Sequence, residues 1–341
     1  MIGPGVSQNA SQHINLTESH GFNVGAAGMF PGITNNLHLH FTSETFLATS
    51  GAYDLRWGVT GEEGTLRINQ GDISVMPTWI FRGFSTYGDE YGFLMTVLGG
   101  DDTGGIIWSP DVMQRARATG LWLGADNEMI DMKDSGSAPP PNLPLMPLMS
   151  PEEIAQLKVW TVAEMQARTV SKAERHYLPA TLDAAMPASA TIGNGWMLAP
   201  IVGHGLTQSR FHTPKIYEPQ GFSIDCLKIV PQNSSAAFFT AEKMVIICLE
   251  GELNVTLNVG DAAITQTLCP QDILSIPCGV WRSFANQGTT EAHAVIVLPG
   301  DARKVPHFAP ELVQAALAND VTLDANGYVC KASVLPPKVF A

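Results

Sequence analysis

The sequence has few charged residues, and few of these are basic. Charged side chains make up 15% of the 341 residues, and the net charge is -13. A chain this acidic lacks the clustered Lys and Arg that contact phosphates, which excludes nonspecific binding to nucleic acid or to an anionic membrane. No apolar run approaches the roughly 18 to 20 residues that span a bilayer. The first residues show neither the basic nor the apolar segment of a signal peptide, so we expect a cytoplasmic protein.

Cysteine is also scarce. There are five, none precedes Cys226, and no two have CxxC spacing. Their number and spacing exclude a metal-binding CxxC pair, and in a reducing compartment we expect buried, reduced thiols rather than a disulfide framework. Hydrophobic residues make up 45% of the chain, which is typical of a globular protein with enough length for two cores.

What the sequence does contain is an internal duplication at a constant offset of 200 residues. The matched pairs include Asp72 with Asp272, Pro77 with Pro277, Arg82 with Arg282, Phe84 with Phe284 and Pro110 with Pro310. The two copies align without a gap over most of their length. A period this long is too large for a solenoid and predicts two homologous domains.

Each copy has the pattern of a β-domain. Apolar and polar residues alternate in short segments separated by Gly, Asp and Asn, for example at 52–57, 65–68, 72–76 and 253–257. Alternation with period two predicts antiparallel strands in a sandwich or barrel. Each copy then ends in a predicted short helix, at 110–118 and 310–318, where a proline suits the first turn.

A segment outside the repeat separates the two copies. Residues 133–150 are rich in Ser, Pro and Gly, and Ser150-Pro-Glu-Glu reads as a capping box for a helix with Ile154, Leu157 and Trp160 on one face. We expect that helix to bridge or brace the two domains. The expected boundaries are an N-terminal domain at 1–130, a linker with the bridging helix at 131–180, and a C-terminal domain at 181–341.

Three residues of the first copy form a candidate metal site. His38, His40 and Glu44 share parity, so on an extended strand they project to one side, which in a small barrel can be the inside. Two imidazoles and a carboxylate suit one divalent ion such as Fe(II), Mn(II), Ni(II) or Zn(II). The second copy has other residues at these positions, namely Phe238, Thr240 and Met244. We therefore expect a metal in the first copy and a packed apolar interior in the second.

At these residues the chain resembles the cupin superfamily. Its first motif is Gly, five residues, His-x-His, three or four residues, Glu, six residues and Gly. The positions that meet it here are Gly32, His38, His40, Glu44 and Gly51. With the duplication, the whole chain is similar to a bicupin. The resemblance implies an all-β fold of two tandem cupin barrels, each a double-stranded β-helix or jelly roll, with a few short helices.

The second cupin motif departs from the family pattern. Trp79 replaces a glycine, and Arg82 stands where a fourth ligand, a histidine, would be. An arginine is always cationic and cannot coordinate a metal. In one interpretation Arg82 pairs with an anionic oxygen of the substrate or of bound oxygen. In the other, Arg82 and its counterpart Arg282 make the same structural salt bridge or backbone contact. A third possibility is a decayed site in which the arginine has replaced the metal's charge.

The resemblance to quercetin-, gentisate- and hydroquinone-type dioxygenases implies an Fe(II)-dependent enzyme that cleaves a phenolic or enolic substrate with O2 in the first domain. Arg82 would be the catalytic residue. Aromatic residues near the site are candidate pocket walls, and Trp57, Trp79, Phe81 and Phe46 are the predicted substrate pocket, with Phe41 and Phe84 nearby. The second domain would be a metal-free scaffold, and cupin domains often form homo-oligomers.

Two other classes stay open. The chain could be a cupin isomerase, lyase or hydrolase that uses the metal as a Lewis acid without redox chemistry. It could also be a non-catalytic binding protein, or one subunit of a heteromeric oxygenase.

Overall fold

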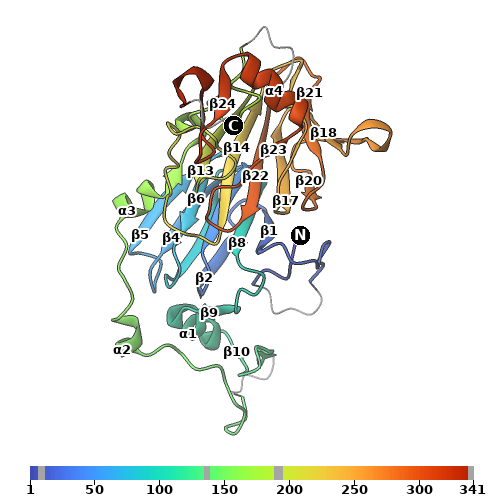
Figure 1. Ribbon diagram of the computed structural model, residues 1–341. Coiled ribbons are helices and arrows are strands. Elements are labelled where there is room, and N and C mark those ends of the chain that lie inside the picture. The colour runs from blue at the N-terminus through green and yellow to red at the C-terminus, as the bar shows by residue number, and fades with distance from the viewer. Residues whose placement is uncertain (7–11, 134–138, 188–194, 337–341) are drawn as a thin grey trace. The chain divides into compact units, whose positions relative to one another are not determined.

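Alternating apolar residues form the strands that the sequence predicts. The computed structural model describes residues 1–6, 12–133, 139–187 and 195–336 (Figure 1). It divides the chain into two compact units, Met1–Lys172 and Ala173–Ala341. Most of the regular structure is β, which confirms the all-β fold class. No helix of the described residues is long and apolar enough to cross a membrane.

The first unit contains two five-stranded antiparallel sheets, with strand orders β1-β8-β3-β6-β12 and β5-β4-β7-β2-β9. Its core lies between them, since residues of both sheets, such as Phe46 and Trp57, belong to one buried cluster. The elements of this unit are β1 (Phe22–Met29), β2 (Thr34–His40), β3 (Glu44–Ser50), β4 (Ala52–Trp57), β5 (Gly64–Ile68), β6 (Ile73–Met76), β7 (Arg82–Tyr87), β8 (Gly92–Gly99), β9 (Ile106–Trp108), α1 (Pro110–Ala118), β10 (Leu121–Leu123), β11 (Met129–Asp131), α2 (Pro151–Ile154), α3 (Val162–Ala167) and β12 (Thr169–Val170).

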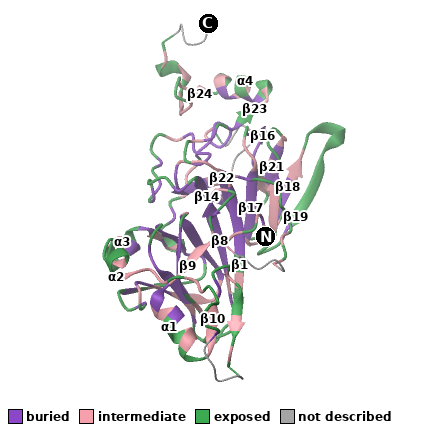
Figure 2. Cartoon of the chain, turned by 90° about the horizontal axis from the view of Figure 1, so that it is seen from below, coloured by how far each residue is buried: buried purple, intermediate pink, exposed green. Residues whose placement is uncertain are grey.

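The second unit repeats this arrangement, with sheets β13-β14-β22-β17-β20 and β19-β18-β21-β16-β23, and with β15 paired to β21. Figure 2 shows β14, β17 and β22 as mostly buried, whereas β19 is mostly exposed. Its elements are β13 (Trp196–Val202), β14 (Phe222–Ile229), β15 (Asn233–Ser234), β16 (Phe238–Phe239), β17 (Met244–Glu250), β18 (Leu253–Leu257), β19 (Ile264–Leu268), β20 (Ile273–Ile276), β21 (Arg282–Asn286), β22 (Ala292–Pro299), β23 (His307–Phe308), α4 (Pro310–Ala318), β24 (Val321–Leu323) and β25 (Val329–Lys331). Short 3-10 turns lie at Lys172–Glu174, Gly260–Ala262 and Ala332–Val334.

The offset of 200 residues is also the offset of the three-dimensional elements. Strands β1, β3 and β8 begin and end 200 residues before β14, β17 and β22, and α1 does the same relative to α4. Both helices span the predicted residues and carry proline in the first turn. Pairwise comparison of the two copies is therefore a comparison of structurally equivalent positions.

The segment after the first barrel differs from the expectation. The predicted helix over Ile154, Leu157 and Trp160 ends at Ile154, and a second helix, α3, begins after Thr161. Each helix has its own capping box, so the chain restarts rather than extends the helix. Strand β12 then pairs with β6, and the segment through Lys172 belongs to the first unit. Residues 134–138 of the expected linker lie outside the described part of the chain.

The cysteines are free, as expected, but only some are buried. Cys226 and Cys248 are buried and Cys330 is half-buried. Cys269 and Cys278 are exposed, which corrects the expectation of buried thiols. Both exposed cysteines follow the ends of strands, in turns that lie outside the core.

Candidate functional site

Three strand ends bring the predicted polar residues together at one end of the first barrel. His40 is the last residue of β2, Glu44 the first of β3, and Arg82 the first of β7. His38 lies directly opposite Arg82 in the pairing of β2 with β7. Leu39, between the histidines, belongs to a separate apolar cluster. Because side chains alternate along β2, the two histidines lie on one face of the strand and Leu39 on the other, as the sequence pattern predicts.

The four side chains form a chain of close contacts. The rings of His38 and His40 have centroids 4.8 Å apart, and His40 Nδ1 lies 3.7 Å from Glu44 Oε2. Arg82 Nη2 donates a hydrogen bond of 3.3 Å to the same carboxylate oxygen. All four residues are buried, and Arg82 is completely so. The structure thus assembles a compact cluster of two imidazoles, one carboxylate and one guanidinium.

Burial and the guanidinium set the protonation of this cluster. Burial, reinforced by the cation of Arg82, lowers the pKa of His38 to about 4 and also lowers that of His40. Burial raises the pKa of Glu44, against the opposing effect of Arg82. Burial lowers the pKa of Arg82 to about 10, which leaves the guanidinium charged at neutral pH. Both imidazoles are therefore neutral near pH 7, the state in which a ring nitrogen can bind a metal.

Several polar atoms of the cluster have no partner. His38 Nδ1 donates to the carbonyl of Asn36 at 2.6 Å, which leaves Nε2 as the ring's acceptor atom. Both ring nitrogens of His40 are buried without a hydrogen-bond partner, and so are Nε and Nη1 of Arg82. Unpaired buried polar atoms are rare in proteins, and a group of them in one place indicates a ligand site.

The donor set fits a divalent metal in kind, but the triad is not preassembled. Two neutral imidazoles and a carboxylate are suitable ligands, and His38 has the backbone hydrogen bond that commonly orients a ligating imidazole. Among the described residues, however, no three His, Cys, Asp or Glu side chains are already arranged to hold a metal. Glu44 gives one oxygen to Arg82 instead. A metal would therefore compete with Arg82 for this carboxylate.

Arg82 and Arg282 make different contacts, so the interpretation that both serve the same structural role is wrong. Arg282 Nε and Nη2 donate to the carbonyl of Val280, and Nη2 also donates to that of Pro277. Arg82 makes none of the equivalent bonds, and its one hydrogen bond goes to Glu44. The twin of Glu44 is Met244, which has no charge to pair with a guanidinium and only a weakly accepting sulfur. The contact of Arg82 with the polar cluster is thus specific to the first barrel.

Three of the four predicted pocket aromatics are core residues. Trp57, Phe81 and Phe46 are almost completely buried in apolar clusters. The indole N–H of Trp57 is satisfied by the carbonyl of Trp160 at 2.8 Å. Only Trp79 is open to solvent, with 48% of its surface exposed. The sequence could not distinguish the buried aromatic residues from the exposed one, because the two kinds differ only in which other residues cover them.

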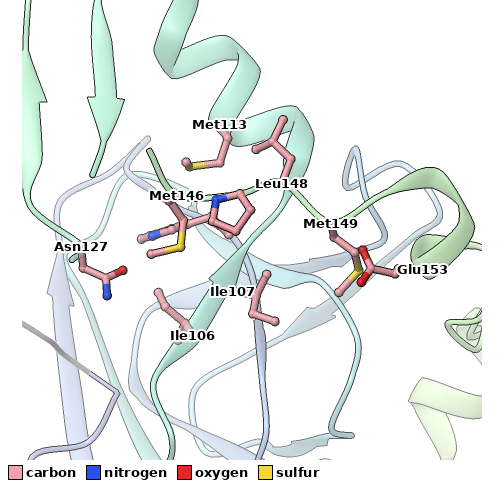
Figure 3. A pocket seen from close by; sticks show the side chains of 10 residues that line it. Ile106, Ile107, Met113, Asn127, Met146, Leu148, Met149 and Glu153 are labelled. Carbon is pink, nitrogen blue, oxygen red and sulfur yellow. The ribbon is translucent and has the colours of Figure 1, made fainter. Parts of the chain in front are cut away.

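One aromatic neighbour of the site lies beyond the motifs. Trp108 pairs with His38 across β2 and β9, and the two rings meet edge to face with centroids 5.5 Å apart. Trp108 also lines a hollow of about 340 Å³ at β9, which Figure 3 shows from close by. Its apolar walls include Ile106, Ile107, Met113, Met146 and Met149. No cupin motif includes this position, but the strand pairing predicted for a barrel brings it beside His38.

Comparisons with known proteins establish the fold. No protein-family model matches the sequence, and no curated protein matches it either. Solved structures do match. Oxalate decarboxylase from Bacillus subtilis at pH 4.6 has a TM-score of 0.51 and 13% identity, over 92% of this chain and 80% of that chain. A deletion mutant (162–163) of the Bacillus subtilis enzyme also has a TM-score of 0.51 and 13% identity, over 94% and 74%. The Lactobacillus farciminis oxalate decarboxylase formate complex has 0.50 and 14%, over 83% and 78%.

The chain shares the fold of these structures along most of its length. Its two tandem β-barrels confirm the fold that the motif and the duplication predict. At an identity near 13%, the structural match establishes the fold alone. The chemistry has to be inferred from the residues of this chain.

Proposed function

We propose that the first barrel is the active site of a metal-dependent bicupin enzyme whose substrate is a small molecule with an anionic oxygen. The observation that carries this proposal is the cluster of His38, His40, Glu44 and Arg82, with its unpaired nitrogens, at one end of the first barrel only. Buried titratable groups with perturbed pKa values, gathered in one place, are typical of an active site.

Each residue has a distinct role in this proposal. His38, His40 and Glu44 hold one divalent ion, for which we propose Fe(II), and Arg82 binds the anionic oxygen. The ion supplies Lewis acidity and, if it is iron, electron exchange with O2. The carbonyl of Asn36 fixes the orientation of His38. The unpaired N–H groups of Arg82 stabilise negative charge on the substrate, inside a barrel that excludes water.

The charge of the cluster favours an anionic substrate. A divalent ion and Arg82 together carry three positive charges, and Glu44 supplies one negative charge. A buried net charge of two is costly, so an anion that enters with the metal would relieve it. The same anion could take over Arg82 and release Glu44 to the metal. We therefore expect the metal and the anionic substrate to strengthen each other's binding.

For the reaction itself we propose cleavage of a phenolic or enolic compound with O2, by the resemblance to bicupin dioxygenases. A second candidate is a non-redox lyase, and one observation favours it: the structures that share this fold include oxalate decarboxylases, enzymes that release CO2 from oxalate. The cluster of this chain suits both candidates, because both need an anionic oxygen beside a metal.

Metal loading followed by two assays separates the candidates. The purified full-length chain is incubated with Fe(II), Mn(II), Ni(II) or Zn(II), desalted and measured by mass spectrometry, with and without oxalate or 2-hydroxybenzoate. We expect bound metal to increase with the anion. Oxygen uptake on adding phenols supports the dioxygenase, and CO2 release from oxalate supports the lyase. If no metal is retained under any condition, the metal-dependent function is overturned, and a binding protein or oxygenase subunit becomes the better hypothesis.

A further inference from the structure

The turn between β6 and β7 holds a tryptophan in a backbone conformation that favours glycine. Trp79 has a φ of 57°, in the left-handed region. Its twin in the second barrel is Gly279, with a φ of 70°. Side chains other than glycine are strained in this region, and bulky ones most of all. The first barrel thus has a large aromatic residue at a position where the second barrel has glycine, which adopts this conformation without strain.

The position of Trp79 is beside the polar cluster. Its backbone N–H donates to the carbonyl of His40 at 3.2 Å. The residue after His40 is Phe41, and the rings of Phe41 and Trp79 meet edge to face with centroids 5.6 Å apart. Both are exposed, Phe41 to 37% and Trp79 to 48%. The two rings therefore lie at the turns that close the end of the barrel, next to the last residue of β2.

The second barrel lacks both rings. The twins of Phe41 and Trp79 are Ala241 and Gly279, although the backbone is the same: Gly279 N donates to the carbonyl of Thr240, as Trp79 N does to that of His40. The aromatic pair thus occurs in the barrel that has the polar cluster and is missing from the barrel that does not. In the second barrel a different edge-to-face pair, Phe239 and Trp281 with centroids 5.0 Å apart, lies at neighbouring positions, and both of its rings are half-buried rather than exposed.

There is also space for a ring beside Trp79. A hollow of about 370 Å³ is lined by Thr78, Trp79, Met149, Glu153, Gln156, Leu157, Lys158 and Trp160. Met149 also lines the neighbouring hollow of Figure 3, where its side chain lies beside Glu153. An exposed tryptophan with an aromatic neighbour on one side and an open hollow beside it can accept a flat apolar ligand by stacking or edge contact.

From these observations we propose that Phe41 and Trp79 form an aromatic lip that binds the ring of a planar, aromatic substrate. The lip selects aromatic over aliphatic anions. This inference rests on the proposed function in one respect, namely that the anionic oxygen of the same substrate binds at Arg82. Binding of the ring by the lip does not itself require metal or turnover.

Calorimetric titration with two anions tests the lip. The probes are 2-hydroxybenzoate, which is flat and aromatic, and oxalate, which is small and aliphatic. In Trp79→Gly, Trp79→Ala and Phe41→Ala we expect the affinity for 2-hydroxybenzoate to fall by about tenfold, because the ring contacts are lost. The affinity for oxalate should stay within about twofold of wild type. Arg82→Met should weaken both anions.

Thermal melting shows whether these variants fold and whether the strain is real. Trp79→Gly and Trp79→Ala lose the same ring, but only glycine relaxes the left-handed backbone, so Trp79→Gly should melt about 2 to 4 °C above Trp79→Ala. The matched control is Gly279→Ala, which has open space around its added carbon and should lower the melting temperature by a similar amount.

The lip proposal is overturned if wild type does not bind 2-hydroxybenzoate, if the variants bind it as tightly as wild type, or if oxalate binding falls in parallel. Failure of the proposed function gives a different result. In that case no metal is retained, while the Trp79 and Phe41 variants still lose the aromatic anion selectively.

Discussion

The two barrels of this chain share a backbone and differ in what fills it. In the second barrel Phe238 stacks on Trp196 with centroids 5.9 Å apart, and Met244 is completely buried in the same apolar cluster. In the first barrel the twins of Phe238 and Met244 are His38 and Glu44. The second barrel shows that this fold closes around an apolar interior. The polar cluster of the first is therefore a feature that the fold does not need.

The shared arginine makes the comparison sharper. Both Arg82 and Arg282 are completely buried, and burial lowers the pKa of each to about 10. Without an acidic twin of Glu44, Arg282 turns to the carbonyls of its own turn. Arg82 keeps two nitrogens unpaired. Arg282 leaves one nitrogen, Nη1, unpaired. The contacts of the arginine thus differ together with the residue at the start of β3 or β17 and with the two positions of the histidines.

The largest effect is expected from His40→Ala. This change removes a ring whose two nitrogens are both unpaired, and it should abolish metal retention and lower activity by more than about a hundredfold. Mass spectrometry measures the metal content. Turnover of the substrate that the oxygen-uptake and CO2-release assays identify measures the activity. The twin variant Thr240→Ala is the control and should leave both unchanged. Retained metal and activity in His40→Ala would place the site elsewhere.

Glu44→Met introduces the residue that the second barrel has at this position, Met244. It leaves the buried guanidinium of Arg82 without its carboxylate, which should lower the free energy of unfolding by about 3 kcal/mol. Urea denaturation measures this loss. In the double variant Glu44→Met with Arg82→Met, no charge is stranded and most of the stability should return. Equal stability of Glu44→Met and wild type would show that the ion pair does not offset the burial of Arg82.

A buried acid of the second unit gives the next effect, through pH. Asp225, whose twin is Gly25, is completely buried, and one oxygen accepts from Leu206 N at 2.7 Å while the other has no partner. Burial raises its pKa from 3.8 to about 7. Between these values only the unfolded chain loses the proton, so the free energy of unfolding falls as pH rises from about 4 to 7.

Asp225→Asn removes this dependence. The variant should equal wild type near pH 4 and exceed its free energy of unfolding by roughly 4 kcal/mol at pH 8. Urea denaturation across this pH range measures the difference. An unchanged pH profile would mean that the carboxylate is ionised in the folded state.

The repeat made much of the fold predictable. The alternation of apolar and polar residues predicted the strands at 52–57 and 253–257, and proline predicted the starts of α1 and α4. The constant offset extended each prediction to the equivalent residues of the other copy. The parity of His38 and His40 also placed these two residues on one side, whereas Glu44 does not continue their strand but begins β3 in the other sheet. Such periodic signals are local, so a single sequence contains them.

The remaining features depend on contacts between distant segments. Nothing in the spacing distinguishes buried Trp57 from exposed Trp79, because the carbonyl that satisfies the Trp57 indole comes from Trp160, more than a hundred residues away. The direction of Arg82 depends in the same way on Glu44, which lies on a strand of the other sheet. Side-chain direction is set by such neighbours, and the sequence pattern does not name them.

The smallest effect concerns the capped segment that adds β12 to the first barrel. Helix α3 places Met165 in the core of this unit, and Thr161 caps it by accepting from Glu164 N at 3.2 Å. Thr161→Ala should lower the free energy of unfolding by about 1 kcal/mol in urea denaturation. Ser150→Ala removes the same kind of cap from α2, a helix with no buried residue, and should cost about 0.5 kcal/mol or less. Equal losses would mean that the α3 segment contributes no more to the first barrel than the exposed turn before it.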